Sequence, residues 1–354
     1  MTSRRSASRI ARFHPGMGLL GLATMTITGT ITGTITGATA SAQTGTFLEE
    51  NGLVAIQFES SPQIDDWTLS TITPGHTGDG YFRWDGPDLF FSPGASGILG
   101  FDFEIETAGE WILSVHNRHE DPDPTEQNDV WIRMDSDPWI KVFSNMAGSV
   151  GAWTWESRFD LAHNDQPQAS YVLTPGTHRI EFSGRSFGFK MDRFHLYLPG
   201  AAGATDVSAP ESTRRFGEAY CVAANNSSGQ ASVVSAIGHP SLAENDVTLR
   251  TEQLPNHVLG YYIVSRNEAY VTGAGGGSGN LCVGAGTGRY VGNVLSSGSA
   301  GAVDLAIDTG SIPQPNGAVA AVVGEVWRYQ FWHRDTSGSG PTSNFSRGLR
   351  VTLE

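Results

Sequence analysis

The side chains best suited to bind a ligand in this sequence are three oxygen donors that lie far apart in the chain. Gln57 and Glu59 occupy alternate positions of the stretch 54–59, which reads as a strand, so both would project from one face. Asp192 lies in the stretch 184–198, among aromatic and aliphatic residues. A carboxylate in such company needs a partner, because its burial alone is prohibitively costly. Two oxygen ligands and a distant aspartate are consistent with a Ca²⁺ site, and pairing with arginine or solvent is the simpler alternative.

The second half of the stretch 184–198 is expected to form the strand that positions Asp192. Asp192, Phe194, Leu196 and Leu198 would share one face of it, since strand side chains alternate with a period of two. The same alternation recurs in Phe-Asp-Phe-Glu-Ile at 101–105 and in several other short runs. Short strands separated by turns rich in Gly, Pro and Asp predict a β-sandwich or jelly roll, and no long amphipathic helix is predicted.

Composition and charge limit the class of protein. The chain has 354 residues, of which 16% are charged and 44 are glycines, and this composition suits turn-rich β structure. Its length favours two domains over one. The net charge of -14 argues against binding to nucleic acid or to anionic membrane surfaces, because both attract clusters of Lys and Arg.

The N-terminal region has the features of a secretory signal. Four arginines within the first twelve residues precede a run of apolar and small residues that extends from Met17 to about Ala40. Ala40-Ser41-Ala42 then matches an A-x-A cleavage site. We therefore expect a signal peptide over 1–42 and a mature chain without a membrane span. That chain would be secreted or held at the cell surface.

The chain has two cysteines, Cys221 and Cys282. Two cysteines in an exported chain more often form a disulfide than bind a metal, and neither has the spacing of a zinc site. A bridge between them would close a loop of roughly 60 residues, which the chain-entropy model values at about 3–4.5 kcal/mol.

The expected fold is all-β, with two jelly-roll-like β-sandwiches joined by a short linker. The first sandwich would span 43–198, and the second, which contains the disulfide, would span 217–354. The residues between them, 199–216, are rich in Ala, Gly, Ser, Thr and Pro, which is typical of a linker.

The order of motifs over about 48–198 resembles the galactose-binding-like β-sandwiches of carbohydrate-binding module families 6 and 35. Residues 54–59 resemble the opening Gln-x-Glu strand of that group, and 77–81 resemble its Gly-Tyr segment. Residues 151–155 resemble its Gly-Gly-Trp-x-x-Trp loop, with one glycine replaced by alanine and one spacer residue missing. Residues 188–194 resemble the closing strand with its aspartate.

The resemblance implies roles for five residues. In that family, the positions that correspond to Gln57, Glu59 and Asp192 hold a structural Ca²⁺ ion. The positions that correspond to Tyr81 and Trp153 supply two rings that grip one sugar, since apolar sugar faces pack on aromatic rings. The family often has a ligand-binding asparagine just before the closing strand, where this chain has Phe-Gly-Phe-Lys over 187–190.

Several aromatic residues have a simpler explanation in packing. Core packing is the expected role of the tryptophans on or beside predicted strands, namely Trp84, Trp131, Trp139 and Trp155. Trp153 lies in a loop rich in Gly and Ser, where a large exposed ring favours a ligand. For Tyr81, the core and the ligand interpretations remain equally open.

We find no sequence motif for catalysis. G-x-S-x-G and H-E-x-x-H are both absent from the sequence. A polar segment over 116–123 contains two histidines and three acidic residues, and we expect a solvated acidic turn there, with cation binding as the alternative. The chain is therefore expected not to be an enzyme.

The hypothesis favoured by these observations is an exported, non-catalytic polysaccharide-binding protein with a structural calcium site. One alternative is a structural or adhesive surface protein without sugar binding, and another is a glycoside hydrolase or an accessory part of one. Residues 217–354 resemble uncharacterised one-disulfide β-sandwiches at the ends of large secreted bacterial proteins. Their expected role is surface display, spacing or protein contact.

Overall fold

The computed structural model describes residues 45–144, 150–162 and 165–354. The signal peptide expected over 1–42 lies outside these residues. The described part is built from strands and two short 3-10 helices, which confirms the prediction of an all-β chain. Among the described residues, no helix has the length and apolar character needed to cross a membrane.

The first group of strands contains every element that positions the predicted site. These elements are β1 (Thr46–Leu48), β2 (Leu53–Gln57), η1 (Phe58–Ser60), β3 (Trp67–Ser70), β4 (Tyr81–Trp84), β5 (Leu99–Ile105), β6 (Gly109–Arg118), β7 (Asp129–Met134), β8 (Ile140–Phe143), β9 (Arg158–Phe159), β10 (Ser170–Leu173), β11 (Gly176–Ser183) and β12 (Lys190–Tyr197).

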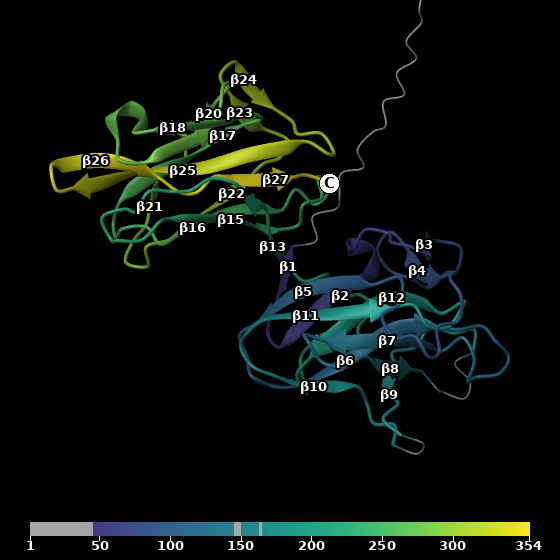
Figure 1. The fold of residues 1–354 in the computed structure, drawn as a ribbon. Helices are drawn as coiled ribbons and strands as arrows, with labels where there is room; N and C mark the ends of the chain where they lie inside the picture. Colours follow the sequence, from purple (N-terminus) through teal and green to yellow (C-terminus); the bar gives the residue numbers. More distant parts are fainter. Residues whose placement is uncertain (1–44, 145–149, 163–164) are drawn as a thin grey trace, which may run out of the picture. The chain divides into compact units, whose positions relative to one another are not determined.

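These strands form two sheets that enclose an apolar core. One sheet has the order β10-β6-β12-β4-β3, with β2 also paired to β12, and the other contains β1-β5-β11-β7-β8-β9 (Figure 1). Alternate strand residues point inward from both sheets and form the core between them. This core is rich in aromatic rings. At its centre, four rings lie with centroids 4.8–6.1 Å apart, namely Phe58, Phe101, Phe182 and Phe194.

The second group of strands follows residue 213. Its elements are β13 (Arg214–Phe216), β14 (Glu218–Ala219), β15 (Val233–Gly238), β16 (Val247–Glu252), β17 (Leu259–Ser265), β18 (Glu268–Thr272), η2 (Ala274–Gly276), β19 (Asn280–Val283), β20 (Gly288–Arg289), β21 (Leu295–Ser296), β22 (Val303–Ile307), β23 (Ile312–Gln314), β24 (Gly317–Val319), β25 (Val326–Ser337), β26 (Gly340–Phe345) and β27 (Leu349–Thr352).

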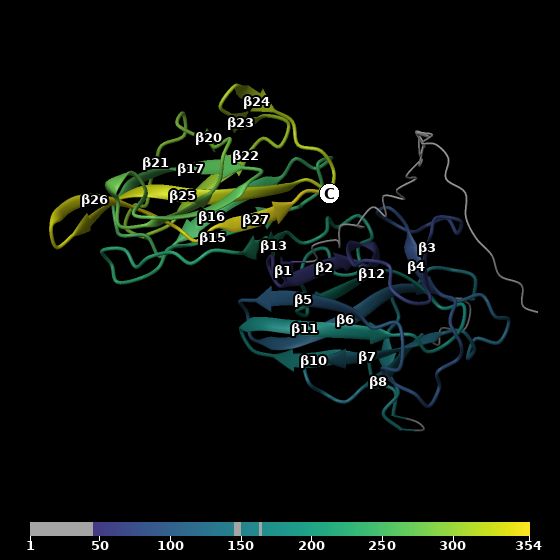
Figure 2. The same ribbon diagram turned by 45° about the horizontal axis from the view of Figure 1, so that its top comes forward.

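The second group has an apolar core of its own. The sheet β14-β27-β25-β17-β20 supplies one side, and β25 lies between β17 and β27 in both views (Figures 1 and 2). Strands β13, β15, β16 and β22 continue the order that contains β1. Trp327, Tyr329 and Phe331 alternate along β25 and are all fully buried in this core. Sandwich-like packing is therefore present in both groups.

The segment 199–216, predicted as a linker from its composition, makes specific hydrogen bonds. The Arg193 guanidinium donates to the carbonyl oxygens of Val207 and Ala209, each at 2.8 Å. Ser212 Oγ accepts a hydrogen bond from the Ala55 amide at 3.0 Å. The last residues of the segment form β13, which pairs with β1 and β15. Composition does not reveal such order, because the acceptors at Val207 and Ala209 are backbone carbonyls, which every residue type has.

The predicted disulfide between Cys221 and Cys282 is present, with a Cα–Cα distance of 6.3 Å and a sequence separation of 61 residues. Replacement of both cysteines by serine is expected to lower the free energy of unfolding by about 3–4.5 kcal/mol, because the unfolded chain regains loop entropy. Urea unfolding measures this difference. Alkylation of the exported protein without reductant should add no mass, and two alkylated thiols would refute the bridge.

Candidate functional site

Asp192 lies at a β-bulge in the pairing of β12 with β6. The register shifts between Met191 and Arg193, which leaves Asp192 as the extra residue of β12. A bulge re-aims a side chain, and here it breaks the alternation of faces. The prediction that Asp192 shares a face with Phe194 and Leu196 is therefore wrong. Those two side chains lie in the core, whereas the Asp192 carboxylate meets residues outside it.

The Asp192 carboxylate is fully buried and well supplied with hydrogen-bond donors. Its Oδ1 accepts from the Thr77 amide at 2.8 Å, and its Oδ2 accepts from Thr77 Oγ1 at 3.0 Å. His116 Nδ1, from β6, lies 2.7 Å from the same Oδ2. The side chain bonded to Asp192 Oδ2 from β6 is thus an imidazole, while the guanidinium of the adjacent Arg193 donates to backbone carbonyls.

Gln57 and Glu59 lie on different elements, so the expectation that they share a strand face is wrong. Strand β2 ends at Gln57, and Glu59 belongs to η1. The loop 77–79 nevertheless brings them together. Thr77 Oγ1 lies 3.0 Å from both Gln57 Oε1 and Asp192 Oδ2, so its single proton is shared between these two acceptors. The Asp79 amide donates to Glu59 Oε1 at 2.9 Å.

A glycine is needed at position 78, where this loop passes over the two side chains. Gly78 has a φ of 58°, a conformation that L-residues with side chains adopt at a cost. A Cβ atom at this position would also collide with Glu59 Oε1. The loop 77–79 therefore links all three predicted ligands, since Thr77 also binds Asp192.

The buried Glu59 carboxyl group lies in surroundings that disfavour its negative charge. Its Oε2 is buried and has no hydrogen-bond partner among the described residues. Burial raises the pKa of Glu59 to about 8, backbone hydrogen bonds oppose this, and the charges of Asp192 and Glu211 raise it further. Negative groups are thus gathered around an unsatisfied oxygen, and a bound cation would relieve both conditions.

The donor set suits a hard cation. Gln57, Glu59 and Asp192 offer only oxygens, as Ca²⁺ prefers. Among the described residues, no group of three His, Cys, Asp or Glu side chains is placed to hold a metal ion. A Ca²⁺ ion here would therefore depend on two carboxylates, an amide oxygen and further oxygens such as backbone carbonyls.

Tyr81 and Trp153, the two rings predicted to grip a sugar, do lie together. Their centroids are 5.4 Å apart and their planes meet at 72°. Tyr81 begins β4 and is only 1% exposed. Its hydroxyl is engaged with Ser70 Oγ at 3.1 Å and with Thr73 Oγ1 at 2.8 Å. The ring of Tyr81 therefore lies beneath the surface in this conformation.

Trp153 is half-buried and is fixed on several sides. Its Nε1 donates to the Pro74 carbonyl at 2.9 Å. Its ring stacks on His116 with centroids 5.1 Å apart, and His116 in turn contacts Trp155 at 4.8 Å. His116 therefore contacts both Trp153 and Asp192, so the aromatic pair and the carboxylate cluster form one continuous site.

Two members of this site, Thr77 and His116, were not predicted from the sequence to belong to it. The segment 116–123 was expected to be a solvated turn, but His116 is buried in β6. The apolar alternation over 111–115 continues into position 116, which gives the one signal that could have placed this residue on a strand. For Thr77, the sequence contains no comparable signal.

Comparisons with known proteins find solved structures that are similar in part, and they assign no family. No protein-family model matches it, and no curated protein matches it. Similar solved structures include a family 35 carbohydrate-binding module from Clostridium thermocellum, at 12% identity and a TM-score of 0.30, which covers 41% of this chain and 98% of that one. The similar structures thus include a member of one of the two families that the motifs resemble.

Two larger enzymes are also similar in part. A GH26-CBM35 β-(1,4)-mannanase from Podospora anserina has 16% identity and a TM-score of 0.31, over 42% of this chain and 28% of that one. A cycloisomaltooligosaccharide glucanotransferase from Paenibacillus sp. has 12% identity and a TM-score of 0.32, over 87% of this chain and 46% of that one. This chain therefore spans less than half of either enzyme. Because all three TM-scores are below 0.5, function has to be argued from the residues of this chain.

Proposed function

We propose that this chain is an exported, non-catalytic glycan-binding protein whose sugar-facing ring is Trp153. The observation that supports this most is the way in which Trp153 is held. Its Nε1 is bonded to the Pro74 carbonyl, and its ring lies against His116 and the edge of Tyr81. An aromatic ring fixed before binding loses little entropy when a sugar stacks on it. Such a ring at a half-buried position is well suited to an apolar sugar face.

Tyr81 takes a supporting role in this proposal. Its buried ring stands edge-on to Trp153, and its hydroxyl ties Thr73 to Ser70. Tyr81 thereby orders the loop whose Pro74 carbonyl holds the indole. Direct stacking of Tyr81 on a sugar stays a prediction, and it requires the buried ring of Tyr81 to become exposed.

We further propose that Gln57, Glu59 and Asp192 hold a structural Ca²⁺ ion. The ion would supply positive charge beside the unpartnered Glu59 Oε2 and would tie η1 and β12 to loop 77–79. The support is the oxygen-only donor set and the clustering of its members around Thr77. Tyr81 lies two residues after this loop, so the ion would also help to hold Tyr81 in place against Trp153.

Calcium is expected to raise the melting temperature of the full chain relative to EDTA. An ion that binds only the folded state stabilises it by about 2.7 kcal/mol at a hundredfold excess over Kd. Glu59→Gln keeps the shape of the side chain but removes its charge, so this variant should fold and lose most of the response. An unchanged melting temperature in EDTA, with no ion found by metal analysis, would refute the site.

Glycan binding is tested by exposing the full chain to a glycan array and to insoluble polysaccharides. We expect retention on at least one neutral polymer, and elution by the matching soluble oligosaccharide. Retention on none would favour a structural or adhesive protein, in which residues 217–354 serve spacing or protein contact. Release of reducing sugar from any polymer at high protein concentration would instead show an enzyme.

A further inference from the structure

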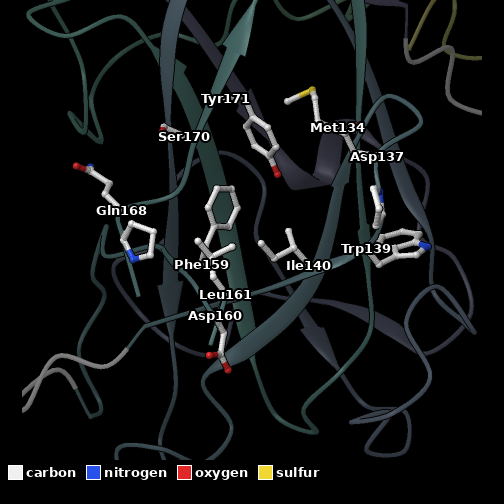
Figure 3. A pocket seen from close by; sticks show the side chains of 12 residues that line it. Met134, Asp137, Trp139, Ile140, Phe159, Asp160, Leu161, Gln168, Ser170 and Tyr171 are labelled. Atoms are coloured by element: carbon white, nitrogen blue, oxygen red, sulfur yellow. The ribbon is translucent and has the colours of Figure 1, made fainter. Parts of the chain in front are cut away.

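A pocket separate from the site around Trp153 lies at an edge of the first group of strands, where β10 of one sheet lies near β8 and β9 of the other. Its volume is about 620 Å³, within the range of roughly 300–1,000 Å³ that is usual for small-molecule sites. Figure 3 shows side chains from both sheets around it. The pocket shares no lining residue with the site around Trp153.

The walls of this pocket are aromatic. Phe159 and Tyr171 meet edge-on, with centroids 5.4 Å apart. Trp139 lies across from them in Figure 3, with Ile140 between, and Leu161 lies beside Phe159. Trp139 was expected to pack in the core, but it is half-buried and lines the pocket instead.

Trp139 is held from outside the pocket. The Arg133 guanidinium lies 4.7 Å from the centroid of its ring. At Gly94, even a Cβ atom would collide with the indole nitrogen, so that turn lies directly against the ring. The indole is therefore positioned before any ligand arrives, as a sugar platform requires.

One polar atom in the pocket lacks a partner. The Tyr171 hydroxyl is buried and has no hydrogen bond to any described residue. Figure 3 shows it directed into the space beside Ile140 and Asp137. Desolvation raises the pKa of Tyr171, so the hydroxyl stays protonated and can donate as well as accept. A buried hydroxyl without a partner is costly, and a polar group on a ligand would satisfy it.

The charges at the pocket select against anions. Asp137 and Asp160 are its two ionisable carboxylates, and Asp160 is paired with Lys141. No Lys or Arg is among the residues that line the pocket in the described structure. The lining therefore offers uronic acids and sulfated sugars no cationic side chain to pair with, whereas a neutral sugar needs none.

We propose that this pocket is a second carbohydrate site, which takes one or two neutral pyranose rings. The sugar would stack on Trp139 and exchange a hydrogen bond with the Tyr171 hydroxyl. This inference rests on the proposed glycan-binding function and adds a second surface to it. Two weak sites on one chain would retain an extended polymer far better than either site alone, because the second contact is intramolecular.

The test is a site-resolved titration of the full chain labelled with 5-fluorotryptophan. Fluorine NMR separates the tryptophan signals, and Trp139→Phe and Trp153→Ala assign the two that matter. The probes are neutral gluco-, manno-, xylo- and galacto-oligosaccharides, with oligogalacturonate as the anionic control. We expect at least one neutral sugar to shift the Trp139 signal saturably, in the unchanged chain and in Trp153→Ala alike. Oligogalacturonate should leave that signal unmoved.

Tyr171→Phe removes only the unpartnered hydroxyl. The variant should fold at least as stably as the unchanged chain, and its Kd at the Trp139 signal should rise roughly fivefold or more. A sugar that moves the Trp153 signal but never the Trp139 signal would overturn the second site and leave the proposed function standing. If neither signal moves with any sugar, both fail. An unchanged Kd in Tyr171→Phe would overturn the part assigned to the hydroxyl.

Discussion

Replacement of Asp192 by alanine is expected to lower the free energy of unfolding by about 3–5 kcal/mol, because hydrogen bonds to a buried carboxylate are lost together and buried donors are left unpaired. The Thr77 amide and His116 Nδ1 lose their acceptor, and Thr77 Oγ1 keeps only Gln57 Oε1. All of them lie around a carboxylate with no exposed surface, so water does not replace it without rearrangement. The variant should also lose any stabilisation by Ca²⁺, since one of two carboxylate ligands is gone.

Urea unfolding with and without Ca²⁺ measures both effects. Asp129→Ala is a matched control, because Asp129 is also buried and its carboxylate pairs with Arg185 and Ser186, neither of which belongs to loop 77–79. The control should be destabilised yet keep its full response to Ca²⁺. An Asp192→Ala protein that unfolds at the original midpoint, or that still responds to the ion, would contradict the role assigned to Asp192.

The strands could be predicted from the sequence because alternation reports burial directly. In β5, Leu99, Phe101, Phe103 and Ile105 are all buried, and the residues between them are partly exposed. One face of such a strand packs on the core, so a period of two appears in the sequence. The disulfide was equally predictable, because the chain has two cysteines and they allow only one pairing.

The site was less predictable because its geometry depends on departures from regular structure. Met191 and Phe194 both face the core, and no apolar pattern reveals that Asp192 between them is a bulge. Likewise, the stretch 54–59 reads as a single strand, although it turns into η1 after Gln57. The motifs named residues that the structure brings together around loop 77–79, but the bulge and the turn determine where their oxygens point.

Hydrogen-bond partners that lie far apart in the chain were a second feature of the site that the sequence did not predict. Asp192 meets His116 across 76 residues of chain and Thr77 across 115. Their hydrogen bonds depend on which strands pair and in which register, and a single sequence does not contain that information. The unpartnered Tyr171 hydroxyl is of the same kind, because only the packing of β10 beside β8 and β9 buries it.

Replacement of Trp153 by alanine is expected to weaken glycan retention by about 30-fold or more, which corresponds to the loss of roughly 2 kcal/mol at a binding hot spot. The proposed sugar contact is ring stacking, and alanine offers no ring. Some loss of stability should accompany it, since the indole also contacts Tyr81, His116 and Pro74. Trp153→Phe keeps an aromatic face and should retain part of the binding.

Trp155→Ala separates binding from stability. Trp155 lies in the same loop, is half-buried like Trp153 and also contacts His116, but its other aromatic contact is His195. This control should lose stability to a similar degree in urea while it keeps most of the retention on the polysaccharide identified by the array. If Trp153→Ala binds as tightly as the unchanged chain, the stacking role of Trp153 is wrong. A sugar contact at Trp153 predicts a larger loss of retention in Trp153→Ala than in Trp155→Ala. Equal losses in the two variants would instead show that disorder of the loop causes them.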